Sequence, residues 1–423
     1  METQSQMEIL LPSSKWDFYF FKTQWMMTRH KKKSQKKNSS PPTMATLSIS
    51  NTTFALELLH TLSQRNPTGN IFVSPLSISS ALAMVYLGAK GETAAQMARA
   101  LSFGSSESVH ADFQGLNADI NSPSASYILK LANRLYGETT SHFQSKFIDS
   151  TQKYYKADLK TVDFIGAPEA SRAEINSWVE QQTENKIKDL LKPGTVSSMT
   201  RLALVNAIYF KGNWKHRFNP ENTKEMLFKV NQNVTATVNM MYLMKKLPYN
   251  YIPELGLQIL EMPYIDNELS MVILLPEETT DGTDPLLKLE KELTHAKLDE
   301  WTNRETMDVR SDVLVHVPKF KLEEECELNE PLAELGMPDV FCATKANLTG
   351  MNGEGGLSLS TVAHKASVEV NEEGTEAAVA TAGIAAFCML REEHFTADHP
   401  FLFFIRHNKS KSILFLGRFS SPQ

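Results

Sequence analysis

The sequence predicts an α+β fold in which residues 44–423 form one large domain with extensive β-sheets. Apolar repeats of helical period and β-rich apolar runs are mixed along the chain, without the regular strand–helix alternation of a parallel α/β fold. Strand-like runs dominate the second half. Beyond residue 43 no further Ser- or Pro-rich linker separates these elements, so we expect them to share one core.

Helices are expected mainly in the first part of this domain. Apolar residues at helical spacing predict a first helix, with members Phe54, Ala55, Leu58, Leu59 and Leu62. Asn51 precedes them and is expected to cap the N-terminus of that helix. The run 70–84 predicts a short strand that turns into a buried helix ending near Gly88, and another helix is expected over 92–101.

Strands are predicted over most of the remainder, with an amphipathic helix over 170–187. The runs 127–136 and 201–210 are rich in β-formers, and the second is almost continuously apolar, which is typical of a strand covered on both faces. Six further runs qualify as strands, namely 257–262, 269–275, 313–317, 359–370, 401–405 and 413–419. Helices are expected near 286–293 and 297–301.

Residues 1–43 differ in composition from the rest. An aromatic cluster over 16–25 is followed by the basic run 29–37 and by two prolines. No apolar run reaches the roughly 18 residues that span a membrane, and the basic residues follow the apolar ones, which is the reverse of a secretory signal. We expect a disordered extension, or upstream sequence absent from a working protein that starts at Met44. The alternative is that 29–37 is a nuclear-localisation or acid-binding patch.

The composition argues against several classes of protein. Lys plus Arg (43) against Asp plus Glu (49) gives a net charge of −6, which argues against nucleic-acid binding by the domain. The three cysteines, Cys326, Cys342 and Cys388, are odd in number and lack metal-type spacing, so neither a disulfide framework nor a metal site is expected. Together with 18 methionines they indicate a reducing compartment such as the cytoplasm.

No familiar catalytic motif occurs in the sequence. Gly-x-Ser-x-Gly, His-Glu-x-x-His, a phosphate loop and a complete dinucleotide fingerprint are all absent, and no cofactor is expected. The glycine-rich run 353–356 is expected to form a turn. Cys388 lies near His394 and His399 in the sequence, but a catalytic cysteine needs a base held in fixed geometry, which a loop of small residues does not supply. An enzyme is therefore not expected.

The most informative segment of the chain is 371–390. It is rich in small and β-branched residues and contains no proline. At period two, four such residues share one face of an extended chain: Thr375, Ala377, Val379 and Thr381. Glu376 falls on the opposite face, where its charge would stay in water. The segment therefore suits both an exposed loop and a strand within a tight sheet.

Five motifs spread over 44–422 resemble those of the serpin family. They are Asn70-Ile-Phe-Val-Ser-Pro-Leu-Ser-Ile78, Leu204-Val-Asn-Ala-Ile-Tyr-Phe-Lys-Gly-Asn-Trp214, Glu369-Val-Asn-Glu-Glu-Gly-Thr-Glu376, Ala397-Asp-His-Pro-Phe-Leu-Phe-Phe-Ile-Arg406 and Phe415-Leu-Gly-Arg-Phe419. Within the family the chain is most similar to the intracellular ovalbumin-type branch. The resemblance implies a serpin fold of about nine helices and three β-sheets with an exposed reactive-centre loop.

The same resemblance implies inhibition by a suicide-substrate mechanism. A serine protease attacks the carbonyl carbon of a bait residue in the loop and forms a covalent acyl-enzyme. The cleaved loop then enters the central sheet as a new strand, carries the tethered protease across the molecule and distorts its active site.

By this resemblance the reactive bond is Cys388–Met389. Thr375 is the fourteenth residue on its amino side, where inhibitory serpins carry a small or β-branched residue. The implied hinge comprises Gly374, Thr375, Glu376, Ala377 and Ala378. Glycine accepts backbone angles that other residues resist, and the alanines leave little to clash as the strand enters.

The bait residues imply two classes of target. Cys388 is small and apolar and fits the shallow primary pocket of elastase-type enzymes, whereas Phe387 would fill the deeper pocket of chymotrypsin-like enzymes. The sequence does not rank the two. Cleavage at Arg391 would lengthen the tether by three residues, so plain substrate cleavage is expected there. The alternative for Cys388 is an incidental exposed thiol, open to oxidation.

The resemblance also assigns positions within the sheet. Four residues match the family's shutter, a polar cluster beneath the central sheet: Ser74, Ser77, Asn206 and His364. Because buried polar groups need partners, such a cluster could act as a reversible latch. Trp214 matches the breach, where the loop first enters, although plain core packing would explain it equally well. The segment 107–121 matches the heparin-binding helix of some serpins but has no Lys or Arg, so heparin is not expected as a partner.

The sequence thus predicts a monomeric, cytoplasmic inhibitor of elastase-type and chymotrypsin-type serine proteases, without membrane or nucleic-acid partners. Release without a signal peptide, and nuclear entry through 29–37, are compatible with this prediction. Two alternatives stay open. A non-inhibitory serpin with a binding or storage role is disfavoured by the intact hinge. The second is inhibition of cysteine proteases by the same loop, which the residues do not distinguish from inhibition of serine proteases.

Overall fold

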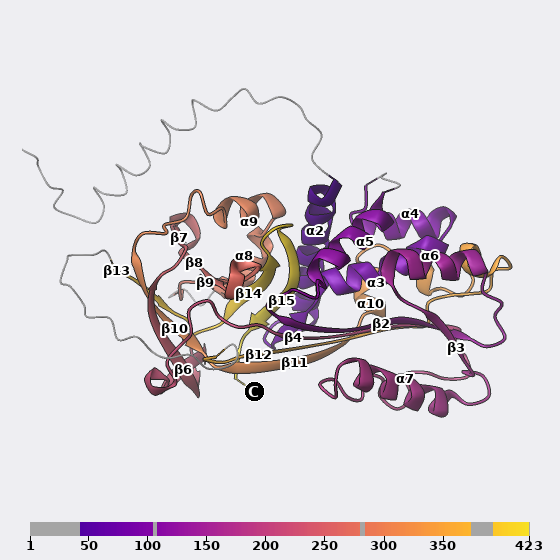
Figure 1. Cartoon of the computed structure of the whole chain (residues 1–423). Helices are drawn as coiled ribbons and strands as arrows, with labels where there is room; N and C mark the ends of the chain where they lie inside the picture. Colours follow the sequence, from indigo (N-terminus) through magenta and orange to yellow (C-terminus); the bar gives the residue numbers. More distant parts are fainter. Residues whose placement is uncertain (1–42, 105–107, 280–283, 374–391, 423) are drawn as a thin grey trace, which may run out of the picture. The chain divides into compact units, whose positions relative to one another are not determined.

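The computed structural model of the chain describes residues 43–104, 108–279, 284–373 and 392–422 (Figure 1). Within these residues there are ten α-helices and three β-sheets, against the nine or so helices that the serpin resemblance implied. The helices are α2 (Thr43–Arg65), α3 (Pro75–Gly88), α4 (Gly91–Ala100), α5 (Val109–Ile120), α6 (Ser145–Tyr155), α7 (Pro168–Gln182), α8 (Pro285–Glu292), α9 (His295–Trp301), α10 (Asn329–Glu334) and α11 (Thr349–Asn352). The last two have only six and four residues.

The central sheet has five strands in the order β11-β12-β4-β2-β3. Their bounds are β11 (Phe320–Glu327), β12 (Thr361–Val370), β4 (Leu202–Lys211), β2 (Ile128–Glu138) and β3 (Leu159–Val162). β12 and β4 run parallel to each other, whereas β11 and β2 pair antiparallel with them on the outer sides. The short β3 pairs only with residues 135–138 of β2, so β3 leaves the first part of that strand uncovered.

Two further sheets lie beside it in Figure 1. The six-stranded sheet consists of β1 (Ile71–Val73), β15 (Ser412–Phe419), β14 (Phe401–His407), β9 (Leu269–Pro276), β8 (Leu257–Pro263) and β7 (Tyr249–Ile252), in that order. The four-stranded sheet consists of β13 (Glu392–Thr396), β10 (Asp312–Pro318), β6 (Val234–Lys246) and β5 (Lys224–Asn231).

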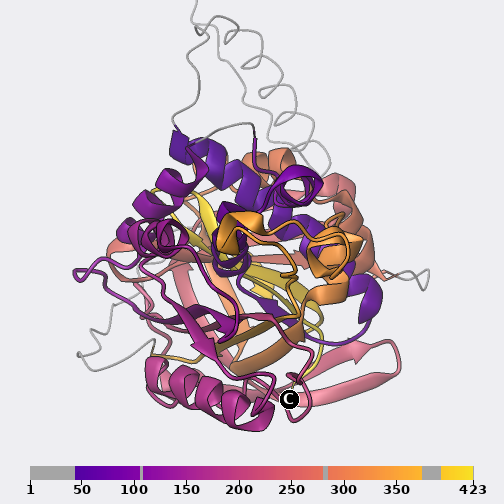
Figure 2. The same cartoon turned by 90° about the vertical axis from the view of Figure 1, so that its right-hand side faces the viewer.

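Helices cover both faces of the central sheet. Figures 1 and 2 show α7 below the sheet and α3, α5 and α6 above it. Because side chains alternate along a strand, β4 contributes to two cores. Ala203 and Val205 pack with Ile175 and Val179 of α7, while the alternate residues of β4 join the main core. The buried strand predicted over 201–210 is thus confirmed.

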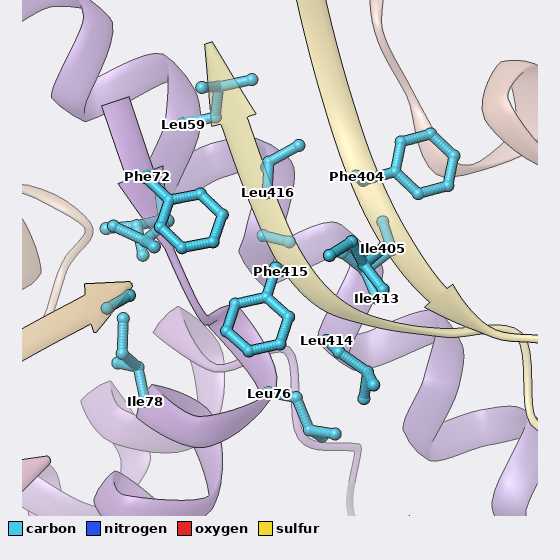
Figure 3. Close-up of a cluster of buried hydrophobic side chains, with 14 of the residues drawn as sticks. Leu59, Phe72, Leu76, Ile78, Phe404, Ile405, Ile413, Leu414, Phe415 and Leu416 are labelled. Carbon is cyan, nitrogen blue, oxygen red and sulfur yellow. The ribbon is translucent and has the colours of Figure 1, made fainter. Parts of the chain in front are cut away.

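The main core is aromatic where the six-stranded sheet meets α2 and α3. Phe72 of β1 stacks on Phe415 of β15, with ring centroids 5.4 Å apart and ring planes 3° apart. The ring of Phe403 on β14 lies 5.9 Å from that of Phe72. Figure 3 shows Leu76 and Ile78 approaching this stack from α3. An apolar wall therefore joins the N-terminal helices to the C-terminal strands.

Two local predictions were wrong. Asn51 is not an N-cap: it lies inside α2, which begins at Thr43, and its Nδ2 donates to the carbonyl oxygen of Ile413 at 3.1 Å. The helix expected over 170–187 ends at Gln182, because Glu184 and Asn185 adopt positive φ. The disordered extension predicted over 1–43 falls almost wholly on residues outside the description, and it stays a prediction.

Candidate functional site

The segment predicted to carry the bait connects two different sheets. β12 of the central sheet ends at Val370, and β13 of the four-stranded sheet begins at Glu392. The predicted hinge and reactive bond lie between them, outside the residues that the structure describes: Gly374, Thr375, Glu376, Ala377, Ala378, Phe387, Cys388 and Met389. The described part of the site is therefore the frame that holds the two ends of this segment.

The directions of β4 and β12 suit the junction between them to accept another strand. A chain that turns back after Val370 runs antiparallel to β12, and because β12 and β4 are parallel, it also runs antiparallel to β4. Parallel pairing is slightly less stable per residue than antiparallel pairing. One new strand would thus replace the weaker kind of junction by two of the stronger kind.

The connection is also long enough for such a strand. The 18 residues 374–391 reach about 60 Å when extended, at roughly 3.3 Å per residue. The ten residues of β4 span only about 33 Å by the same measure. The segment therefore has enough residues to pair along the whole length of β4.

The four predicted shutter residues lie together at this junction, and we call them the shutter cluster. The backbone N–H of Ser74 donates to Nε2 of His364 at 3.1 Å, and Nδ1 of His364 lies 2.6 Å from Oδ1 of Asn206. Nδ2 of Asn206 donates to Oγ of Ser77 at 2.6 Å. Oγ of Ser74 donates to the carbonyl oxygen of Leu414 at 2.7 Å, and it accepts from the N–H of Ser77 at the start of α3.

Within the shutter cluster, these contacts hold His364 in one neutral form. Because Nε2 accepts from Ser74, the ring proton resides on Nδ1 and is donated to Asn206. Burial lowers the pKa of His364 to about 3, so the imidazole is neutral at pH 7. Asn206 lies on β4 and His364 on β12, so their hydrogen bond crosses the junction that a new strand would have to open.

The shutter cluster continues across the sheet through two residues that sequence reasoning missed. Asn133 of β2 lies opposite Asn206, and Cys326 of β11 lies opposite His364. Directly opposed residues share one face of a sheet, so Asn133, Asn206, His364 and Cys326 form a polar row across four strands. Burial raises the pKa of Cys326 to about 12, so its thiol stays protonated.

The sequence held a signal for Asn133. At period two along this strand stand Leu129, Leu131, Asn133 and Leu135, so the amide is the polar member of an otherwise apolar face. An amide on a core-facing position needs a partner or a special role. Only the register of β2 against β4 shows that it stands opposite Asn206.

Trp214 holds the chain just beyond β12. Its Nε1 donates to the carbonyl oxygen of Asn371 at 2.9 Å, and its ring stacks on Tyr264 with centroids 4.5 Å apart. The indole is buried. Trp214 therefore packs in the core and also fixes the first residue after β12, so the two readings of this residue are both compatible with its contacts.

Glu372, the second residue after β12, is also held in place, and sequence reasoning assigned it no role. Its carbonyl oxygen accepts from the N–H of Phe218 at 3.1 Å. Its carboxylate accepts from Oγ1 of Thr223 at 2.9 Å and pairs with Lys319 at 3.0 Å. Backbone and side chain are thus both held, so any rotation of the segment must take place after Glu372.

The described residues offer little for catalysis. None of them forms a group of three or more His, Cys, Asp or Glu that could hold a metal. Both ring nitrogens of His399 are engaged, with Asp398 at 2.8 Å and the carbonyl oxygen of Pro276 at 2.7 Å. The run 353–356, expected to form a turn, is a bend followed by irregular chain, in which Gly353 and two further glycines adopt positive φ. No helix in the described part is long and apolar enough to span a membrane.

Comparison with known proteins places the chain in a family. The family model described as serpin (serine protease inhibitor) matches residues 49–422. Leukocyte elastase inhibitor of Homo sapiens is 58% identical over 380 residues, covering 90% of this chain and 100% of the relative. The protein of the same name from Equus caballus is 57% identical, with the same coverage.

Solved structures agree with this family. The crystal structure of maspin matches with a TM-score of 0.83 at 35% identity, over 90% of this chain and 99% of that one. Uncleaved ovalbumin matches with a TM-score of 0.82 at 34% identity, over 89% of this chain and 100% of that one. The serpin fold expected from the sequence motifs is confirmed, and this chain belongs to the serpin family.

Proposed function

We propose that this chain inhibits serine proteases as a suicide substrate, by inserting its reactive loop between β4 and β12. One observation carries the proposal: these parallel strands can pair antiparallel with the returning segment 374–391, and their contact is closed by the hydrogen bond between Asn206 and His364. The relatives named leukocyte elastase inhibitor, which match over their full length, support it.

The protease supplies the nucleophile, and the inhibitor supplies the peptide bond that is cleaved. The serine Oγ of the protease attacks the carbonyl carbon of Cys388, and the amide nitrogen of Met389 takes a proton and leaves. The products are an ester between the protease and Cys388 and a new amino terminus at Met389. Insertion then moves the ester away from the loop's original position before water can attack it.

Insertion begins at the predicted hinge. Because Trp214 and Glu372 fix the chain up to that point, the change in direction falls on Gly374 and the residues after it, Thr375, Glu376, Ala377 and Ala378. A strand paired on both sides would add roughly ten net backbone hydrogen bonds, which is on the order of 10 kcal/mol. This gain drives the transfer of the tethered protease.

The targets follow from the bait. Elastase-type enzymes cleave after Cys388, whereas chymotrypsin-like enzymes are expected to use Phe387 as well. The name of the human relative supports the first class. The inhibitor acts as a monomer and needs no cofactor.

The cellular setting is the cytoplasm, as the free thiols suggest. Cys326 and Cys342 are unpaired in the described structure. α5 carries no Lys or Arg and includes Asp112 and Asp119, so it would repel a sulfated polysaccharide. Release without a signal peptide, and a nuclear role if residues 29–37 are present, belong to the same proposal.

A gel tests the proposal directly. The protein is mixed with neutrophil-type elastase, and in parallel with chymotrypsin, and then boiled in detergent before electrophoresis. A covalent complex that survives boiling is expected, with a released peptide that starts at Met389 for elastase by mass spectrometry. Cleaved protein without complex would favour a non-inhibitory serpin.

The variant Thr375→Arg tests the hinge assignment and is compared with the wild type in the same gel. A buried charge in the inserting strand would oppose insertion, so this variant should be cut at the same bond without trapping the protease. Undiminished complex from Thr375→Arg would contradict the hinge assignment while leaving inhibition itself intact.

A further inference from the structure

β13, the strand that follows the segment 374–391, is an edge strand with a single neighbour. It pairs in parallel with β10 from Glu392 to Thr396, and no strand of the described chain pairs with its other side (Figure 1). Parallel pairs are slightly less stable per residue than antiparallel pairs. The attachment of β13 therefore depends also on the connection 397–400, which leads from it to β14.

His399 holds this connection through both nitrogens of its ring. Nδ1 lies 2.8 Å from Oδ1 of Asp398, and Nε2 lies 2.7 Å from the carbonyl oxygen of Pro276, the last residue of β9. The side chain of His399 is only 13% exposed. Because a carboxylate oxygen and a carbonyl oxygen are both acceptors, each ring nitrogen needs a hydrogen. Both contacts are satisfied together only by the imidazolium ion.

Asp398 supplies the opposite charge and a further link. The hydrogen bond from His399 lowers the pKa of the Asp398 carboxyl against the effect of burial, and the cation of Lys229 acts in the same direction. The carbonyl oxygen of Asp398 accepts from the N–H of Lys229 on β5 at 2.7 Å, and the N–H of Ala397 donates to the carbonyl oxygen of His316 on β10 at 2.9 Å. We call residues 397–399 the distal anchor, because they join β5, β9 and β10.

Two further carboxylates follow β9, and both have other partners. Glu278 pairs with Nζ of Lys229 at 2.6 Å, and this hydrogen bond raises the pKa of the lysine. Glu277 accepts from the hydroxyl of Tyr251 at 2.9 Å. Asp398 is therefore the carboxylate that His399 contacts, and Lys229 stays charged near neutral pH.

Two other histidines lie near the distal anchor. Burial, and then the neighbouring His394, lower the pKa of His316 on β10, so that this imidazole is neutral at pH 7 and above. His394 is an exposed residue of β13. Histidine is the side chain that ordinarily changes charge between about pH 5 and 8. A change of charge at the distal anchor above pH 7 thus falls on His399, and His394 is the residue to control for.

Loss of one proton from His399 breaks one of its two contacts. A neutral imidazole has one N–H and one acceptor nitrogen. The proton is best kept on Nδ1, because a hydrogen bond to the charged carboxylate of Asp398 is the stronger one. Nε2 then turns a lone pair towards the carbonyl oxygen of Pro276. Two acceptors repel each other at this distance, so the distal anchor separates from β9.

We infer that His399 is a positioning residue for the inhibitory reaction: its protonated ring fastens the distal end of the reactive loop to β9, and loss of that proton loosens β13. The anchoring follows from the contacts of the described residues alone. Its effect on inhibition rests on the proposed function.

A fixed β13 keeps the uncleaved segment 374–391 from inserting fully. β11 follows directly after β10 and its Phe320 pairs with Val370, so the sheet that contains β13 adjoins the end of β12. Pairing along β4 would take the segment about 33 Å from that end, and a return over the same distance exceeds its reach of about 60 Å. Release of β13 would remove this restraint without cleavage, and the bait would be lost.

Amide hydrogen exchange tests the distal anchor without a protease. Protection factors, corrected for the intrinsic exchange rate, are measured for peptides that cover β13 at about pH 6 and about pH 8.5. In the wild type we expect protection to fall at least about tenfold at the higher pH, because a charge-assisted hydrogen bond is lost. His399→Gln, which carries no charge, should show low protection at both values. Equal protection of the wild type at the two values would overturn the inference.

His399→Arg should rescue the anchor. A guanidinium stays charged at pH 8.5 and offers several N–H groups to a carboxylate and a carbonyl together. Protection of β13 should then be high at both pH values. Low protection in this variant would show that charge is not what holds the connection. The matched control His394→Gln should keep the pH dependence of the wild type, and its loss there would assign the effect to His394 instead.

The effect on inhibition is tested by incubating intact protein at each pH, returning it to pH 7 and titrating it with neutrophil-type elastase. Trapping capacity should be lost roughly tenfold faster at the higher pH in the wild type, in proportion to the opening of β13, and equally slowly at both in His399→Arg. Equal rates in the wild type would overturn the positioning role. A fresh protein that traps no elastase would contradict the proposed function instead, and the exchange measurement would still decide the anchor.

Discussion

Two regions of the molecule are closed in different ways. Around Phe72 the six-stranded sheet is held by stacked rings and buried aliphatic side chains. Across the β4–β12 junction, the polar row places Asn206 and His364 in a short hydrogen bond over a parallel strand pair. Apolar packing is lost in proportion to the area exposed, whereas a hydrogen-bonded contact separates when a few directed bonds break. Under the proposed mechanism, the sheet around Phe72 stays together, whereas the β4–β12 junction opens.

The largest effect is expected from breaking the aromatic wall. Phe72→Ala removes a fully buried ring that stacks on Phe415, and it should lower the free energy of unfolding by about 3–5 kcal/mol. Urea unfolding measures the change. Leu227→Ala is the control, because its side chain is 63% exposed and the expected change is within about 0.5 kcal/mol. Similar shifts in both variants would remove the contrast between the two regions.

A smaller effect should come from the protonation of His364. Above pH 6.5 the native and unfolded states are both neutral at this residue. As the pH falls, the unfolded chain, with a pKa of about 6.5, takes up a proton that the native imidazole, with a pKa of about 3, does not. Native stability is therefore lost towards acid, by about 2 kcal/mol between pH 6.5 and 5.

The variant His364→Gln isolates this contribution. Urea unfolding at pH 6.5 and pH 5 should show a smaller acid loss in the variant than in the wild type. His110, whose pKa burial lowers to about 4, is present in both proteins and cancels in the comparison. An identical acid loss in both proteins would show that the imidazole is not confined to its neutral form.

The smallest effect is expected at Trp214, whose indole holds the chain just after β12. Trp214→Phe keeps an aromatic ring against Tyr264 but loses the hydrogen bond to Asn371, which corresponds to about 1 kcal/mol in the free energy of unfolding. Urea unfolding at pH 7 provides the measurement. A loss as large as that of Phe72→Ala would assign Trp214 to the core packing alone.

The difference between the two regions also explains what the sequence could predict. Buried strands such as β4 and β15 were predicted, because continuous apolar runs are visible locally. β5 and β6 were missed, because most of their residues are exposed and Phe228 is the one buried residue of β5. Asn51 was misplaced because its partner, Ile413, is 362 residues away.

The shutter cluster was predicted only through its motifs. Ser74, Ser77, Asn206 and His364 come from separate parts of the chain, and composition alone does not join them. Asn133 and Glu372 escaped notice, because their roles depend on strand register and on contacts with Phe218, Thr223 and Lys319. Contacts of this kind can be recognised only in the folded structure.

The proposed difference between the region around Phe72 and the β4–β12 junction depends on one claim. The claim is that the central sheet of the native protein is not in its state of lowest free energy. Limited cleavage between Phe387 and Met389, followed by thermal unfolding of intact and cleaved protein, tests it most directly. A gain on the order of 10 kcal/mol should raise the unfolding temperature by roughly 12 °C, because about 380 residues unfold with an entropy of about 2.1 cal/mol/K each. Cleaved protein that unfolds at the same temperature as intact protein, or below it, would contradict the account.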